Sequence, residues 1–98
     1  YNANPASICA AIDVLAEASS PTCLVLGGMG ELGDTSDALH EQVGEYAAAK
    51  GIQSVYSLGP NAVFYQRGYI KGGQPGTFSI CPDHLTIAQA LAKNEKDK

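Results

Sequence analysis

Apolar positions along the chain follow two patterns, one typical of helices and one typical of buried strands. Ile8, Ile12 and Leu15 recur at intervals of four and three residues, which places them on one face of a helix. The mostly apolar stretch at 22–26 predicts a buried strand instead, and residues 52–58, which end at a Gly-Pro pair, are predicted to form a second one. The two patterns follow each other in turn, so we expect helices and strands to alternate.

Specialised residues mark where the predicted helices begin and end. Asn4 and Pro5 suit the N-cap and the first turn of the first helix. Ser36 is a candidate N-cap for the second helix, and Asp37 would sit in its first turn, where the helix dipole favours an anion. Gly51 suits the position just past the end of that helix.

The second half of the chain shows weaker signals of the same kind. Residues 61–69 favour a short helix after a proline, although a Val-Phe-Tyr run within them also suits a strand. A strand is predicted at 77–81, and Asp83 is a candidate cap for a last helix. The alternation predicts one α/β domain over residues 1–98, with a mainly parallel sheet and helices on its faces.

Charge and hydropathy exclude two classes of function. The net charge is −4, so the chain has no electrostatic drive toward phosphate backbones, even though Tyr65, Arg67, Tyr69 and Lys71 interleave aromatic and basic residues. No run approaches the roughly 20 apolar residues that a membrane span needs. We therefore expect neither a nucleic-acid nor a membrane partner.

The three cysteines are predicted to be structural. Cys9, Cys23 and Cys81 lack the spacing of a metal site, so we expect buried apolar side chains and no bound metal. Their use fits a reducing cytoplasm. The chain starts at Tyr1 without an initiator Met, so we expect it to be a piece of a longer polypeptide.

The stretch 28–33 reads Gly-Met-Gly-Glu-Leu-Gly and matches G-x-G-x-x-G after a predicted strand. In a dinucleotide-binding turn the helix opens at the motif, and an acid follows at the end of the second strand. Here the helix signals begin only after the last glycine, the second strand ends without an acid, and Glu31 would repel a phosphate. The sequence therefore argues against a nicotinamide or flavin site, and Gly-Lys-Ser/Thr of a P-loop is absent.

Two stretches together resemble a known family. The chain opens with Tyr-Asn-Ala-Asn-Pro, and about twenty residues later reads Val-Leu-Gly-Gly-Met-Gly-Glu-Leu-Gly, followed by Leu-His and Val-Gly-Glu-Tyr-Ala. This pattern resembles the C-terminal domain of the Mur ligases that add a D-Ala-D-Ala dipeptide to a peptidoglycan precursor. The likeness is strong up to about residue 58 and faint afterwards. It departs at Gly28, where the family usually has Asp.

The resemblance implies a Rossmann-like three-layer sandwich whose sheet is incomplete at both termini. It implies a bacterial cytoplasmic enzyme that uses ATP and Mg²⁺ to join D-Ala-D-Ala to UDP-MurNAc-tripeptide, with this domain closing over ATP and the dipeptide. The P-loop and UDP-sugar domains would lie outside these 98 residues. On this interpretation the fragment alone is inactive and holds neither cofactor, and its own N-terminal and central domains are its partners.

The resemblance also assigns roles to individual residues. Tyr1, Asn2 and Asn4 would lie on the ATP side, although Asn4 is equally suited to capping the first helix. Met29 and Glu31 would belong to a substrate-side loop, with Met29 more typical of a plug against the sheet. His40 would support that loop through a structural hydrogen bond, and no residue of this chain is assigned a catalytic role. The alternative interpretation is a free-standing nucleotide-binding or regulatory α/β module.

Overall fold

Helices and strands alternate along the chain in the computed structural model, which describes residues 4–17, 22–29, 33–82, 85–89 and 92. In chain order the elements are α1 (Pro5–Ala16), β1 (Cys23–Leu26), the 3₁₀ turn η1 (Gly33–Thr35), α2 (Ser36–Ala49), β2 (Ser54–Leu58), α3 (Ala62–Lys71) and β3 (Thr77–Cys81). Residues 85–89 are also helical. The predicted alternation is confirmed, and the ambiguous segment after the second strand is a helix.

The described sheet is parallel throughout, as predicted. Its strand order is β1-β2-β3. Leu24 lies opposite Val55 on the neighbouring strand, and Val55 lies opposite Phe78 on the next. Each strand follows a helix that returns the chain to the start of the sheet, so all three strands end at the same edge.

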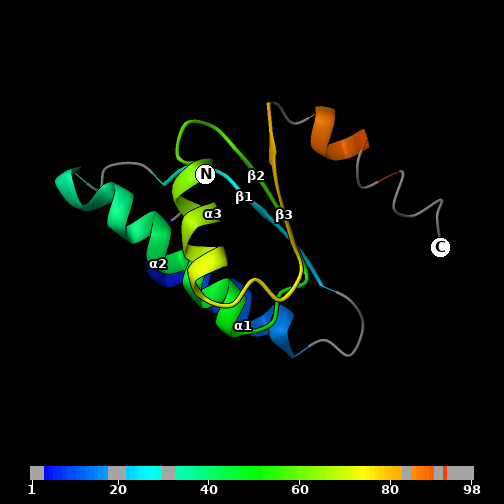
Figure 1. Ribbon diagram of the computed structural model, residues 1–98, viewed down its shortest axis with the longest axis horizontal. Coiled ribbons are helices and arrows are strands. Elements are labelled where there is room, and N and C mark those ends of the chain that lie inside the picture. Colours follow the sequence, from blue (N-terminus) through cyan, green and yellow to red (C-terminus); the bar gives the residue numbers. More distant parts are fainter. Residues whose placement is uncertain (1–3, 18–21, 30–32, 83–84, 90–91, 93–98) are drawn as a thin grey trace.

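The sheet has helices on both faces. The larger core cluster joins α1, α2 and α3 to one face through buried side chains such as Ile12, Val43 and Val55. On the opposite face, Ile87 of the 85–89 stretch packs against Tyr56 and Cys81. Figure 1 shows this arrangement, with α1–α3 on one side of the strands and the orange helical stretch on the other. The predicted three-layer order is therefore confirmed.

Two glycines bring α2 and α3 into backbone contact. A Cβ atom added at Gly44 of α2 would lie 2.0 Å from the carbonyl oxygen of Tyr65, and one added at Gly68 of α3 would lie 1.8 Å from that of Glu41. Real Cβ atoms never approach so closely, so only glycine fits at either position. The two helices can therefore pack against each other and against the sheet as one layer.

Two buried tyrosines attach α3 to the backbone of the strands. The Tyr65 hydroxyl donates to the carbonyl oxygen of Gly27, just after β1, at 2.7 Å. The Tyr69 hydroxyl donates to the carbonyl oxygen of Ile52, just before β2, at 2.6 Å. Each bond gives a partner to a buried hydroxyl that would otherwise be costly to desolvate.

The helix ends agree with the predicted caps, apart from the start of α2. Asn4 forms a reciprocal capping box with Ser7, and Gly51 has a φ of 77° just past the end of α2. Ser36 was predicted as the N-cap of α2, but Thr35 holds that position and makes no side-chain capping bond. The reason is the 3₁₀ turn before α2, which leaves Thr35 in a near-helical rather than an extended conformation. The predicted cap Asp83 lies outside the described residues.

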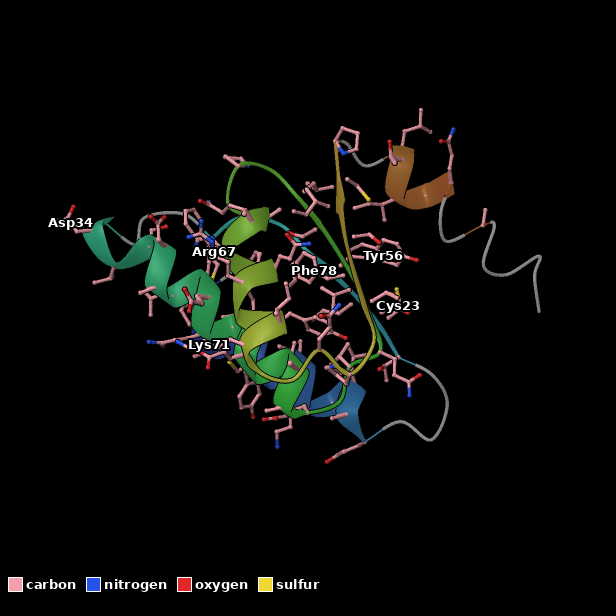
Figure 2. All side chains as sticks on the ribbon, in the orientation of Figure 1. Cys23, Asp34, Tyr56, Arg67, Lys71 and Phe78 are labelled. Carbon is pink, nitrogen blue, oxygen red and sulfur yellow. The ribbon has the colours of Figure 1, made fainter. Side chains whose placement is uncertain are left out.

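The prediction that all three cysteines are buried is wrong for Cys23. Cys81 is buried and Cys9 is partly buried, but Cys23 is exposed. Its side chain lies on the face of β1 opposite α1–α3, the face to which Tyr56 also belongs. Figure 2 shows both residues on that side of the sheet. The apolar run 22–26 predicted a strand correctly but could not show that the described chain covers this face only in part.

Candidate functional site

The carboxyl ends of the strands form the candidate site, because parallel strands present their following loops at one edge. The loop after β1 begins with Gly27, Gly28 and Met29, and Asn61 follows β2 and precedes α3. The first helix runs antiparallel to the strands, so the start of α1 lies toward the same edge (Figure 1).

His40 holds the loop after β1 from one side. Its Nε2 accepts a hydrogen bond of 3.0 Å from the backbone N–H of Met29. Its Nδ1 lies 2.6 Å from the carbonyl oxygen of Ser36, one turn earlier in α2. A carbonyl can only accept, so Nδ1 carries the proton and Nε2 is free to accept: the imidazole is neutral. His40 is fully buried, and the predicted supporting hydrogen bond to the preceding loop is present.

Tyr65 holds the same loop from the other side, through its bond to the Gly27 carbonyl. Its ring packs edge-on against the His40 imidazole, with centroids 4.8 Å apart. Burial raises the pKa of the Tyr65 hydroxyl to about 12, so it remains a donor throughout the physiological range. We refer to the pair His40 and Tyr65 as the loop clamp. Together they fix the backbone on both sides of Gly28.

Sequence reasoning missed Tyr65 as a member of the site. It treated Tyr65 and Tyr69 as part of an interleaved aromatic and basic surface, but both rings are fully buried. The recurrence of Ala62, Tyr65 and Tyr69 at intervals of three and four was the signal for an inward face of α3. No stacking surface for bases therefore exists at these tyrosines.

Gly28 and Asn61 meet at the strand ends. A Cβ atom added at Gly28 would lie 3.1 Å from the side-chain nitrogen of Asn61. The Asn61 amide therefore occupies the space next to position 28, and the side chain is half-buried. Sequence reasoning did not single out Asn61, since its proximity to Gly28 arises only from the parallel pairing of β1 and β2.

The other predicted residues have different outcomes. The side-chain oxygen of Asn4 accepts a hydrogen bond of 2.8 Å from the backbone N–H of Ser7, so its capping role is confirmed. Met29 is 4 % exposed and belongs to the main core cluster, as expected of a plug against the sheet. Tyr1, Asn2 and Glu31 lie outside the described residues.

The two described thiols with a shifted pKa are weak nucleophiles. Partial burial of the sulfur atoms raises the pKa of the Cys9 and Cys23 thiols, which disfavours the nucleophilic thiolate. Within the described ranges no group of three or more His, Cys, Asp and Glu side chains could hold a metal ion. None of the helices described is long and apolar enough to cross a membrane.

The three described cations each contact another side chain. Lys50 lies 3.7 Å from a carboxylate oxygen of Asp13, and Lys71 lies 3.4 Å from one of Glu41. Arg67 stacks over the ring of Phe64 at 5.4 Å. Figure 2 shows Arg67 and Lys71 along α3. These contacts of the described cations involve neither member of the loop clamp.

The helix that follows the glycine motif begins later than in a dinucleotide-binding turn. The α-helix after it begins at Ser36, beyond the last glycine and a 3₁₀ turn. Its N-terminal N–H groups are thus displaced from the loop that would hold a pyrophosphate. This agrees with the argument made from the sequence.

Comparison with known proteins identifies what the chain is similar to. The family described as "Mur ligase, glutamate ligase domain" matches residues 1–97. The UDP-N-acetylmuramoyl-tripeptide–D-alanyl-D-alanine ligase of Escherichia coli is 54% identical over 59 residues, 60% of this chain and 13% of the relative. The ligase of the same name from Treponema pallidum is 46% identical over 90 residues, 91% of this chain and 19% of the relative.

Solved structures give the same result for the fold. Two crystal structures of MurF from Acinetobacter baumannii superpose on the whole chain, with TM-scores of 0.69 and 0.65 at 23% and 26% identity. The chain covers 27% and 26% of those two proteins. It therefore spans about a quarter or less of the length of the relatives that it matches.

Proposed function

The chain belongs to the Mur ligase family, and from this premise we propose that it is the C-terminal domain of an ATP-dependent ligase that adds D-Ala-D-Ala to UDP-MurNAc-tripeptide. Relatives that carry this ligase name cover 60% and 91% of the chain. The whole enzyme would work in the bacterial cytoplasm, in peptidoglycan synthesis.

The observation that carries this proposal within the structure is the loop clamp. His40 and Tyr65 hold the loop after β1 by its backbone, at the edge of the sheet where α/β proteins bind ligands. Glu31 follows directly in the sequence, and we propose that it and Met29 belong to the side of the site that receives the dipeptide. The domain contributes a rigid, preorganised wall rather than a reacting group.

ATP and Mg²⁺ are assigned to the whole enzyme. Asn4 fits a role on the ATP side, because its side-chain oxygen is used for capping while its amide N–H groups remain able to donate to phosphate or ribose oxygens. We propose the same side for Tyr1 and Asn2. The described residues offer no group of side chains suited to a metal ion, and we propose that Mg²⁺ is held elsewhere in the whole enzyme.

The test is a reconstitution of the full-length enzyme. It should form ADP only when ATP, Mg²⁺, UDP-MurNAc-tripeptide and D-Ala-D-Ala are all present, and the 98-residue chain alone should form none. A full-length enzyme that accepts a single amino acid but not the dipeptide would contradict the proposed substrate. Micromolar binding of NADH or FAD by the isolated chain would instead favour a nucleotide-binding module.

A further inference from the structure

We propose that Asn61 contacts the incoming dipeptide, with its side-chain amide placed in the space that Gly28 leaves open. The proposal rests on the proposed function and adds a residue to it. Asn61 would be a binding residue that orients the acceptor and takes no part in bond making.

The first argument is the way the amide is placed. A Cβ atom at Gly28 would come within 3.1 Å of the Asn61 side-chain nitrogen, closer than nine in ten real contacts of a Cβ atom. Any larger residue at position 28 would therefore press on the amide. Glycine at this position allows Asn61 to lie beside the loop that His40 and Tyr65 hold.

The second argument is that Asn61 does not do what asparagine usually does at a helix start. Asn4 precedes α1 with an extended backbone, φ −130° and ψ 166°, and its side chain caps the helix. Asn61 precedes α3 with φ −89° and ψ −2°, and its side chain makes no capping bond. The amide is therefore not engaged by the helix and faces the loop after β1 instead.

The third argument concerns the chemistry that an amide recognises. A side-chain amide has two N–H donors and a carbonyl acceptor, which together match a peptide group or the two ends of a short peptide. The three described cations contact Asp13, Phe64 and Glu41 and none of them lies against Gly28 or Asn61. A half-buried amide without a cation beside it suits a dipeptide better than a triphosphate.

The experiment uses the full-length enzyme and three variants: Asn61→Ala, Gly28→Ala and the double variant. We expect Asn61→Ala to raise the KM for D-Ala-D-Ala about tenfold with little change in kcat, as for loss of a hydrogen bond present in both ground and transition states. The KM values for ATP and UDP-MurNAc-tripeptide should stay within about twofold. Gly28→Ala should raise the dipeptide KM less, by displacing the amide.

The double variant separates a specific contact from a general disturbance. If Gly28→Ala acts by displacing the Asn61 amide, it should add nothing once that amide is gone. Val63→Ala, an exposed change two residues further along α3, is the matched control and should leave all KM values unchanged. Asn61→Asp keeps the shape of the side chain and removes its N–H donor, so it should also raise the dipeptide KM. This variant provides a second test if Asn61→Ala fails to fold.

Two outcomes would overturn the proposal. One is a dipeptide KM within about twofold of the parent in both Asn61 variants, with circular dichroism showing folded protein. The other is an increase confined to the KM for ATP. Failure of the proposed function is recognised separately, because the parent enzyme would then form no ADP with the complete set of substrates.

Discussion

Replacing Gly68 by alanine should separate α2 from α3 and destabilise the domain. The new Cβ atom would lie 1.8 Å from the carbonyl oxygen of Glu41, whereas a close C···O contact in proteins is about 3.3 Å. The helices would have to move apart by about 1.5 Å along that contact. A gap of 0.5–1 Å already loses roughly a quarter to a half of the dispersion energy between packed atoms.

The change in the free energy of unfolding follows from two opposing effects of the Gly68→Ala substitution. Overpacking a core costs about 1–3 kcal/mol, and a clash between backbones belongs at the upper end because no side chain can rotate away. Alanine is favoured over glycine inside a helix by about 1 kcal/mol. The net loss should therefore be about 2 kcal/mol, which is a substantial part of the roughly 5–15 kcal/mol that stabilises a typical domain.

Urea unfolding of the 98-residue chain, followed by circular dichroism, measures this loss. With a slope of about 1–2 kcal/mol per molar, the midpoint should fall by about 1–2 M. Gly27→Ala is the matched control, since a Cβ atom there has nothing within 4 Å, and its midpoint should shift little. A Gly68→Ala midpoint at or above that of the parent, at an unchanged slope, would refute the close approach of the two helices.

Three further variants test the cap of α1 and the loop clamp. Asn4→Ala removes the capping box and should cost about 1 kcal/mol in the same urea experiment. Tyr65→Phe leaves the carbonyl of Gly27 without its donor and should cost about 1–3 kcal/mol. The folded-state pKa of Tyr65, about 12, lies above its ordinary value of 10.0, so the folded protein holds the proton more tightly than the unfolded chain. The free energy of unfolding should therefore fall between pH 10 and about 12. This fall should be smaller in Tyr65→Phe than in the parent. His40→Ala removes the acceptor of the Met29 N–H, so the Met29 amide hydrogen should exchange faster than in the parent. An unchanged exchange rate at Met29 would contradict the loop clamp.

Features set by neighbouring residues could be predicted from the sequence. The cap at Asn4 and the left-handed glycine at Gly51 depend on a few residues of local backbone, and both are present. The parallel sheet follows from the alternation of patterns. The start of α2 was misjudged by one residue at the cap, because the 3₁₀ turn through Thr35 is a local choice between two similar hydrogen-bond patterns.

Features set by distant parts of the chain could be predicted only in part. The bond from the loop to His40 was expected, whereas Tyr65 was not recognised because its burial depends on α3 packing over the end of β1. The contact of Gly28 with Asn61 joins residues that follow different strands. The exposure of Cys23 depends on how much of the second sheet face is covered, which no local pattern records.

The two tyrosines of α3 also bear on how the strands find their alignment. A parallel pair has no hairpin turn to set its register, and a slip of one residue displaces a strand by about 3.3 Å. Tyr65 bonds to the carbonyl after β1 and Tyr69 to the carbonyl before β2, so a slipped pair could satisfy one hydroxyl but not both. Because α3 follows both strands in the chain, this check acts late when the protein emerges from the ribosome. Until α3 has been synthesised, the alignment of β1 with β2 rests on contacts between the strands themselves, such as the bond from the Ser57 hydroxyl to the Leu26 carbonyl, without the two tyrosine bonds.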